Sequence, residues 1–182
     1  MQSRAAAAAG SLIFLVVVPG SVAGLIPWTI TGWQVYDSTL RALPLWTLGW
    51  VMIVAGASVL LYAFLTFVME GIGTPAPVAP TAHLVVGGLY RFIRNPMYVA
   101  VVAAVIGQAF ALGQASLFWY GLMVALLQAA FVHLYEEPDL RNRYGTEYDR
   151  YRVNVPAWYP RLRPWRQDND GHREPLRGPS GG

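Results

Sequence analysis

The sequence predicts an all-α protein with about four transmembrane helices and short interfacial helices toward the C-terminus. Hydrophobic residues make up 55% of the 182 residues and charged residues only 13%, a balance that soluble domains of this size rarely show. Four apolar stretches come close to the roughly 20 residues that cross a bilayer. They cover residues 5–26, 43–69, 97–112 and 115–135. A polytopic membrane protein is therefore expected.

The first apolar stretch contains Pro19 and Gly20, so a kink is expected where the proline removes a backbone hydrogen bond. A cleaved signal peptide over residues 1–23 is the alternative, because Arg4 precedes the apolar run and small residues end it. Signal peptides have apolar cores of about 7–15 residues, and the longer run here favours a membrane span. The first two stretches carry no chemistry and are expected to form a scaffold.

The third and fourth apolar stretches are expected to form a tight antiparallel hairpin, because only Gly113 and Gln114 separate them. Asn95 and Pro96 precede the third stretch. Asparagine favours the N-cap of a helix, and proline fits the first turn, where its missing N–H costs nothing. A helix is therefore expected to begin here, near the membrane surface.

The charge pattern predicts the orientation and excludes several kinds of site. Every basic residue is arginine, and with four spans all of them except Arg41 lie on one side of the membrane. The positive-inside rule then places both termini in the cytoplasm. Most arginines follow the last apolar stretch, which argues against a nucleic-acid partner. The absence of cysteine excludes disulfides and a cysteine nucleophile, and no spacing typical of metal ligands occurs.

Two motifs with fixed spacing point to a function. The segment GLYRFIRNPMY over residues 88–98 is followed about forty residues later by EEPDL over residues 136–140 and then by Tyr148 and Tyr151. Over residues 82–160 this pattern resembles the isoprenylcysteine carboxyl methyltransferase and phospholipid methyltransferase superfamily. That resemblance implies an integral membrane enzyme that transfers a methyl group from S-adenosylmethionine to a lipophilic small molecule or lipid.

The chain is expected to divide into four parts. Residues 1–70 are expected to form a two-span scaffold, residues 71–81 a Pro/Gly-rich loop, residues 82–165 the methyltransferase-like core that the resemblance implies, and residues 166–182 a disordered tail, because the tail is polar and rich in Gly and Pro. Within the core, Gly145 is expected to end one short helix, and Thr146-x-x-Asp149 resembles a capping box that opens the next. The segment with Val155, Pro156 and Pro160 is expected to fold over the cofactor as a lid. An interfacial aromatic belt is the alternative for Trp158, Tyr159 and Trp165.

The predicted cofactor site combines a helix N-terminus with a carboxylate. The free N–H groups after Asn95, together with Arg94, suit the carboxylate of a bound amino acid, and the resemblance assigns Glu136 as the cofactor ligand. Glu136 is expected at the C-terminal end of the fourth helix, where the helix dipole disfavours a negative charge. The residues expected to bind the cofactor are Ala82, His83, Leu84, Val85, Gly88, Tyr90, Arg94, Asn95, Pro96, Met97, Tyr98 and Glu136. The superfamily histidine aligns with Ala82, so His83 serves only by a shift of one position.

The residues expected to take part in catalysis are Arg94, Glu137 and His133. Methyl transfer by in-line displacement at sulfur needs no nucleophilic side chain, but an ammonium acceptor needs a base, for which Glu137 or His133 is suitable. The alternative is that both glutamates pair with Arg94, Arg141 or Arg143 at the membrane surface. For His133 the alternative is a hydrogen bond within the helix packing.

The expected acceptor is a lipid with an amine, a hydroxyl or a short acid. In isoprenylcysteine methyltransferases an arginine four residues before the cofactor glutamate holds the substrate carboxylate, and this sequence has Val132 there. Two functions from other classes stay open: a membrane reductase that uses a nicotinamide cofactor, and a non-catalytic membrane scaffold.

Overall fold

The computed structural model describes residues 13–36, 43–71 and 84–166. All regular elements in these residues are helices, and three are long and apolar enough to cross a membrane: Ile13–Thr31, Leu43–Thr66 and Ala115–Tyr144. A fourth apolar helix, Pro96–Leu112, is shorter, as the third stretch of the sequence predicts. The all-α, polytopic membrane fold is therefore confirmed. Ala82, His83, most of the Pro/Gly-rich loop and almost all of the expected tail lie outside the described residues.

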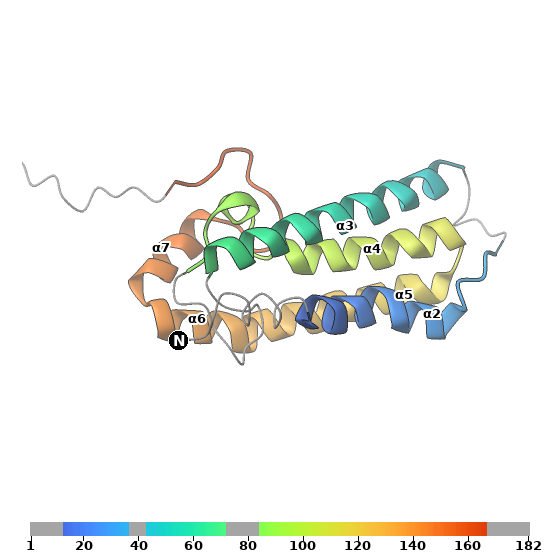
Figure 1. Ribbon diagram of the computed structural model, residues 1–182, viewed down its shortest axis with the longest axis horizontal. Coiled ribbons are helices and arrows are strands. Elements are labelled where there is room, and N and C mark those ends of the chain that lie inside the picture. Colours follow the sequence, from blue (N-terminus) through green and yellow to red (C-terminus); the bar gives the residue numbers. More distant parts are fainter. Residues whose placement is uncertain (1–12, 37–42, 72–83, 167–182) are drawn as a thin grey trace, which may run out of the picture.

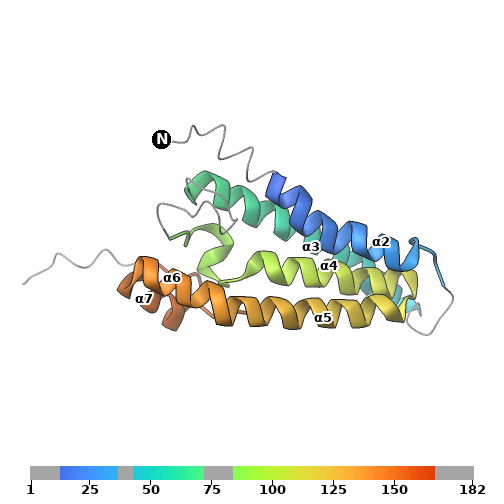
Figure 2. The ribbon, with the colours of Figure 1, turned by 90° about the horizontal axis from the view of Figure 1, so that it is seen from below.

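Four helices lie roughly along one long axis (Figures 1 and 2). In chain order these are the first helix (Ile13–Thr31, which contains η1, Ser21–Leu25, and α2, Ile26–Thr31), α3 (Leu43–Gly71), α4 (Pro96–Leu112) and α5 (Ala115–Phe131). The 3₁₀ turn η3 (Gly88–Arg91) and the helices α6 (Glu137–Tyr144) and α7 (Thr146–Asn154) gather at one end of this bundle. That end holds both sequence motifs.

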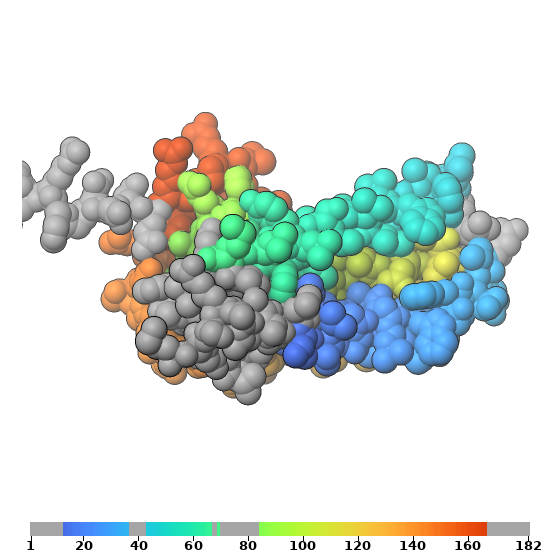
Figure 3. Space-filling model, viewed as in Figure 1, coloured from blue at the N-terminus to red at the C-terminus, as the bar shows by residue number. Residues whose placement is uncertain are grey.

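Small residues bring α3 and α4 into close contact. A Cβ atom on Gly56 would lie 2.7 Å from the backbone oxygen of Ala100, and one on Gly107 would lie 2.7 Å from the oxygen of Gly49. Helices in lipid associate largely through such close backbone packing, because the hydrophobic effect between them is weak. The short α4 is thus held by α3, and in Figure 3 its yellow-green surface shows between α3 and the first helix.

The first helix does not end at residue 26, as expected, but continues to Thr31. Two residues after Pro19 it widens into the π-helical turn η1, and both prolines and π-helical turns are places where helices bend. Two neighbouring helices bind this turn: Tyr120 donates from Oη to the oxygen of Val22 (3.0 Å), and Gln108 donates from Nε2 to the oxygen of Ala23 (2.8 Å). Neighbouring side chains can satisfy backbone groups in this way at membrane depth.

The fourth helix also runs further than expected. It passes through a second π-helical turn, η4 (Val132–Glu136), into α6, which ends at Gly145 with a φ of +53°. Glu136 and Glu137 therefore lie inside a continuous helix. The prediction that Glu136 lies at the C-terminal end of the fourth helix is wrong. The physical reason is that Pro138 occupies the first turn of α6, where a proline is tolerated.

Two expected side-chain caps are not formed. Gly145 is the N-cap of α7 and Thr146 is already helical, so the predicted capping box is wrong. Asn95 occupies the N-cap of α4, as predicted, but its side chain makes no capping hydrogen bond. The amide of Asn95 is therefore not used by the helix that it precedes.

The chain after α7 runs back beside residues 88–98, the first of the two sequence motifs. Arg94 donates its backbone N–H to Pro156 (2.9 Å), and Trp165 donates its N–H to Arg91 (2.9 Å). Trp165 is buried against Tyr151, so the expectation that it belongs to an interfacial belt is wrong. Trp158 and Tyr159 are exposed, as that alternative expects. Main-chain hydrogen bonds thus join the C-terminal segment to the loop before α4.

Candidate functional site

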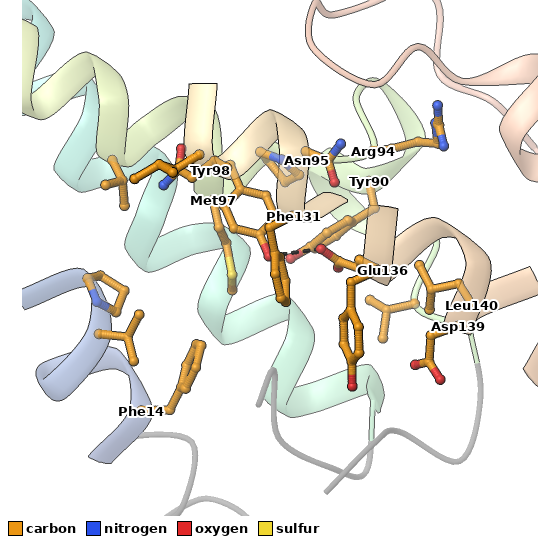
Figure 4. Close-up of a pocket in the computed structure, with 18 of the residues that line it drawn as sticks. Phe14, Tyr90, Arg94, Asn95, Met97, Tyr98, Phe131, Glu136, Asp139 and Leu140 are labelled. Atoms are coloured by element: carbon orange, nitrogen blue, oxygen red, sulfur yellow. Dashed lines mark hydrogen bonds between the residues drawn. The ribbon is translucent and has the colours of Figure 1, made fainter. Parts of the chain in front are cut away.

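A cavity of about 680 Å³ opens at the end of the bundle where the two motifs meet. Its size lies within the range of roughly 300–1,000 Å³ that is typical of small-molecule sites. The first helix, α4, α5, η4 and α6 contribute walls, and Figure 4 shows Phe14 on one side and Glu136 on the other. The predicted cofactor residues that line it are Leu84, Val85, Tyr90, Arg94, Asn95, Pro96, Met97, Tyr98 and Glu136.

Glu136 and Tyr98 join the two motifs inside this cavity. The Tyr98 hydroxyl donates to Oε2 of Glu136 at 2.8 Å, as the dashed line in Figure 4 marks. Tyr98 lies in the first turn of α4, and Glu136 lies in η4. Among the described residues Glu136 has no cationic partner, and its Oε1 accepts no hydrogen bond. A carboxylate in a mostly apolar cavity is stable only with a positive partner or a proton, so Glu136 suits a cationic ligand.

Asn95 supplies a second unpaired polar group. The residue is only 8% exposed and lines the cavity at the N-terminus of α4. Its Nδ2 has no hydrogen-bond partner among the described residues. Buried polar atoms are nearly always paired in folded proteins, and a helix N-terminus offers further N–H groups. This corner of the cavity therefore suits an anionic group on the same ligand.

Arg94 does not contribute its charge to this corner. Its Nη1 donates to Oε1 of Glu137 (2.7 Å) and to Oη of Tyr148 (3.0 Å), and its Nε donates to the oxygen of Val155 (2.9 Å). Figure 4 shows the guanidinium directed away from the Tyr98–Glu136 pair. Arg94 thus borders the cavity but ties the loop before α4 to α6 and α7.

Glu137 belongs to the same structural network and does not line the cavity. Its side chain is 10% exposed and lies between Arg94 and Arg152, whose Nη2 is 3.3 Å from Oε2. Successive residues of a helix point about 100° apart, given 3.6 residues per turn, so Glu136 and Glu137 face different surroundings. Of the two alternatives for the glutamates, pairing with arginine describes Glu137 but not Glu136.

The tyrosines of α7 complete this network in the neutral form. Burial raises the pKa of Tyr148 to about 12, even though the Arg94 guanidinium beside it acts in the opposite direction. Burial also raises the pKa of Tyr151, which donates its hydroxyl to the backbone oxygen of Tyr90 at 2.7 Å. Both tyrosines lie on one face of α7, as predicted, and hold it against the first motif.

Two predicted residues lie elsewhere. The side chain of His133 is 74% exposed, with Nδ1 3.9 Å from Oε2 of Glu137, and it does not line the cavity. Gly88 has a φ of +51°, and a Cβ there would lie 2.9 Å from Oγ1 of Thr66 on α3. Gly88 therefore serves a tight turn against α3. Val132 is buried and does not line the cavity, so its identity says little about the acceptor.

The cavity is also lined by residues that the sequence patterns do not identify. They come from the first helix, α5 and α6, and include Phe14, Val18, Val22, Gln128, Tyr135 and Asp139. Gln128 could have been found from the sequence, because it is the one amide side chain in α5. For the first helix there is no such signal, since an apolar residue facing a cavity looks the same in sequence as one facing lipid. The expected scaffold half thus forms one wall of the site.

Comparison with known proteins agrees with the motifs. A family model described as phospholipid methyltransferase matches residues 45–147, a range that includes both Tyr98 and Glu136. Neither a curated protein nor a solved structure matches the chain. Within the described residues, no group of three or more His, Asp or Glu side chains could hold a metal ion. Because the match covers more than half of the 182 residues, the chain belongs to the phospholipid methyltransferase family of membrane enzymes.

Proposed function

We propose that the protein is an S-adenosylmethionine-dependent methyltransferase that acts on a lipophilic acceptor at the cytoplasmic face of the membrane. The observation that carries this proposal is the Glu136 carboxylate, which faces a mostly apolar cavity and has no cationic partner among the described residues, since the two arginines that line the cavity, Arg94 and Arg143, pair with Glu137 and Asp139. S-adenosylmethionine carries an ammonium and a sulfonium, either of which can supply the missing positive charge. When bound, it supplies the electrophilic methyl group.

The cofactor's amino-acid end fits the polar corner of the cavity. Glu136 would bind a cationic group, while Nδ2 of Asn95 and the N–H groups at the start of α4 would bind the carboxylate. Arg94 has a different task from the one expected, since its guanidinium already binds Glu137 and Tyr148. We assign Arg94 and Glu137 as positioning residues that fix the loop carrying Asn95.

The protein's contribution to the reaction is alignment. Tyr98 orients Glu136 through its hydrogen bond, and the network around Arg94 holds the first motif in place. Aligning two reactants can contribute on the order of 7–11 kcal/mol to lowering a barrier. A neutral amine or a carboxylate already has a lone pair, so it needs no nucleophilic side chain from the enzyme, and the methylated amine releases its proton to solvent. An ammonium acceptor would lose its proton to solvent before the transfer, since His133 does not line the cavity.

The rest of the cavity wall suits a lipophilic acceptor. Away from Glu136 it consists largely of aliphatic and aromatic side chains, among them Val22 of the first helix, Val101 of α4 and Val124 of α5. Such a surface favours hydrocarbon over water, by about 25 cal/mol for each Å² buried. The acceptor would place its chain here and its polar group near the cofactor.

Replacing Glu136 tests the cofactor site. In Glu136→Gln we expect S-adenosylmethionine binding to weaken by roughly 2–5 kcal/mol, because one member of a charge pair is lost, while the protein still folds. Calorimetric titration of the purified protein measures the change. Asp149→Asn is the matched control, since Asp149 pairs with Arg141 outside the cavity. Unchanged affinity in Glu136→Gln would make Glu136 an ordinary buried carboxylate.

The cytoplasmic orientation rests on the arginine distribution and needs its own test. Reporter fusions at Gly182 and after Thr39 should report opposite sides of the membrane, with the C-terminal fusion in the cytoplasm. A C-terminal reporter on the outer side would place the cavity away from the compartment where S-adenosylmethionine is made, and would contradict this part of the proposal.

A further inference from the structure

Gln128 is a polar side chain without a structural task in the described part of the protein. It lies in α5 and lines the cavity. Its Oε1 is buried and has no hydrogen-bond partner among the described residues. A buried, unpaired carbonyl costs free energy, and more so at membrane depth, where water cannot replace the partner. Such an atom needs an explanation, and a ligand that pairs with it is one.

The position of Gln128 places it between two parts of the cavity. Glu136 follows eight residues later, which corresponds to about 12 Å along a helix with a rise of 1.5 Å per residue. On the other side of Gln128 the α5 wall is formed by Met123, Val124 and Leu127, all apolar, and by Tyr120, whose hydroxyl already donates to the oxygen of Val22. Gln128 thus lies between the part of the cavity that contains Glu136 and the part lined by apolar side chains.

Other polar groups near this boundary are already engaged. The Tyr98 hydroxyl donates to Glu136, and the Arg94 guanidinium binds Glu137 and Tyr148. The Asn95 amide offers a donor, whereas Oε1 of Gln128 offers an acceptor. A ligand group that satisfies Gln128 must therefore carry an N–H or an O–H.

We propose that Gln128 binds the polar group of the methyl acceptor, an inference that rests on the proposed function. Its Oε1 accepts a hydrogen bond from an N–H or O–H on the acceptor, whose hydrocarbon chain occupies the apolar part of the cavity. Gln128 orients this group and takes no proton, because an amide oxygen is a far weaker base than a carboxylate. The site then selects amphiphiles that carry a hydrogen-bond donor at the polar end.

This role predicts opposite effects on stability and on binding. Replacing Gln128 by leucine removes an unpaired buried carbonyl, so the ligand-free protein should unfold at the same temperature or a higher one. The same change removes the partner of the acceptor's donor. A glutamine with a purely structural role would instead lower the unfolding temperature when it is replaced.

The experiment uses the purified full chain in a non-ionic detergent and two amphiphiles of equal chain length. Dodecylamine carries N–H donors, whereas dodecyltrimethylammonium carries the same charge without them. In Gln128→Leu we expect about tenfold weaker binding of dodecylamine, the size of one net hydrogen bond, and little change for dodecyltrimethylammonium. Gln34→Leu is the matched control, because Gln34 is exposed and hydrogen-bonds through its backbone. Gln128→Glu, which keeps an acceptor oxygen, should retain the preference for dodecylamine.

S-adenosylmethionine binding is measured in parallel and separates the two proposals. If Gln128→Leu keeps cofactor affinity and loses the preference for dodecylamine, the inference is supported. It is overturned if the preference persists, if cofactor affinity falls instead, or if the leucine variant does not fold, since Gln128 would then serve the cofactor site or the fold. Failure of the wild-type protein to bind S-adenosylmethionine would count against the proposed function itself.

Discussion

The inner and outer faces of the η4 turn carry neighbouring glutamates with different surroundings. On the inner face, Glu136 accepts a hydrogen bond from the Tyr98 hydroxyl, lines the cavity and has no cationic partner among the described residues. On the outer face, Glu137 lies between Arg94 and Arg152. A carboxylate whose charge is balanced by arginines of the fold stabilises the structure, whereas one without a cationic partner is available to a ligand.

The largest effect is expected on the outer face. In Glu137→Gln two arginines lose their carboxylate partner, one of them almost buried, and removing one member of a buried pair typically costs about 3–5 kcal/mol of stability. Unfolding followed by circular dichroism in detergent measures this loss.

Arg143→Ala is the control for that measurement, because the Arg143–Asp139 pair is about one-third exposed and such pairs contribute about 0–1 kcal/mol. Cofactor affinity of the folded fraction of Glu137→Gln should fall less than that of Glu136→Gln, because Glu137 acts only through Arg94 on the loop that carries Asn95. Intact stability with lost cofactor binding would be the opposite result. It would indicate that Glu137 binds the cofactor, and the difference between the two glutamates would be contradicted.

The second prediction concerns acceptors that carry a carboxylate. A prenylated cysteine should be a poor acceptor compared with a long-chain amine, because Arg94 is engaged by Glu137 and Arg143 by Asp139. An unpaired buried carboxylate costs about 2 kcal/mol or more, roughly thirtyfold in kcat/KM.

Side-by-side turnover of the two acceptors with labelled S-adenosylmethionine decides this question. Efficient methylation of the prenylated cysteine, lost in Arg94→Ala while cofactor binding is retained, would show that Arg94 leaves Glu137 and serves the inner face when substrate is present.

The smallest effect is expected for the hydrogen bond that orients Glu136. Tyr98→Phe removes the donor to Oε2 and should weaken S-adenosylmethionine binding by about 1 kcal/mol, or roughly fivefold. Tyr62→Phe, on an exposed tyrosine of α3, is the control.

A double-mutant cycle with Glu136→Gln separates orientation from general packing. If Tyr98 acts through Glu136, the two effects should not add. Additive losses would mean that Tyr98 affects binding independently of the inner-face carboxylate.

Much of the fold follows from hydropathy and helix signals. The apolar stretches predict α3, α4 and α5, because a long apolar segment in lipid must satisfy its backbone hydrogen bonds within a helix. The start of α4 is predicted by Asn95-Pro96, and the hairpin of α4 and α5 by Gly113-Gln114. The spacing of the two motifs also indicates that residues 88–98 and 136–140 belong to one site. Tyr98 and Glu136 are indeed in contact.

Which side chains face the cavity depends on the packing of the helices against one another. The π-helical turn at Val132–Glu136 shifts the phase of α5 relative to α6, so the direction of Glu136, Glu137 and His133 cannot be read from a regular period of 3.6 residues. The first helix becomes a cavity wall, and Gln128 an unpaired group, through packing between segments distant in sequence. Hydropathy determines that a segment is buried in an apolar environment, but packing determines whether its neighbour is lipid, protein or a ligand.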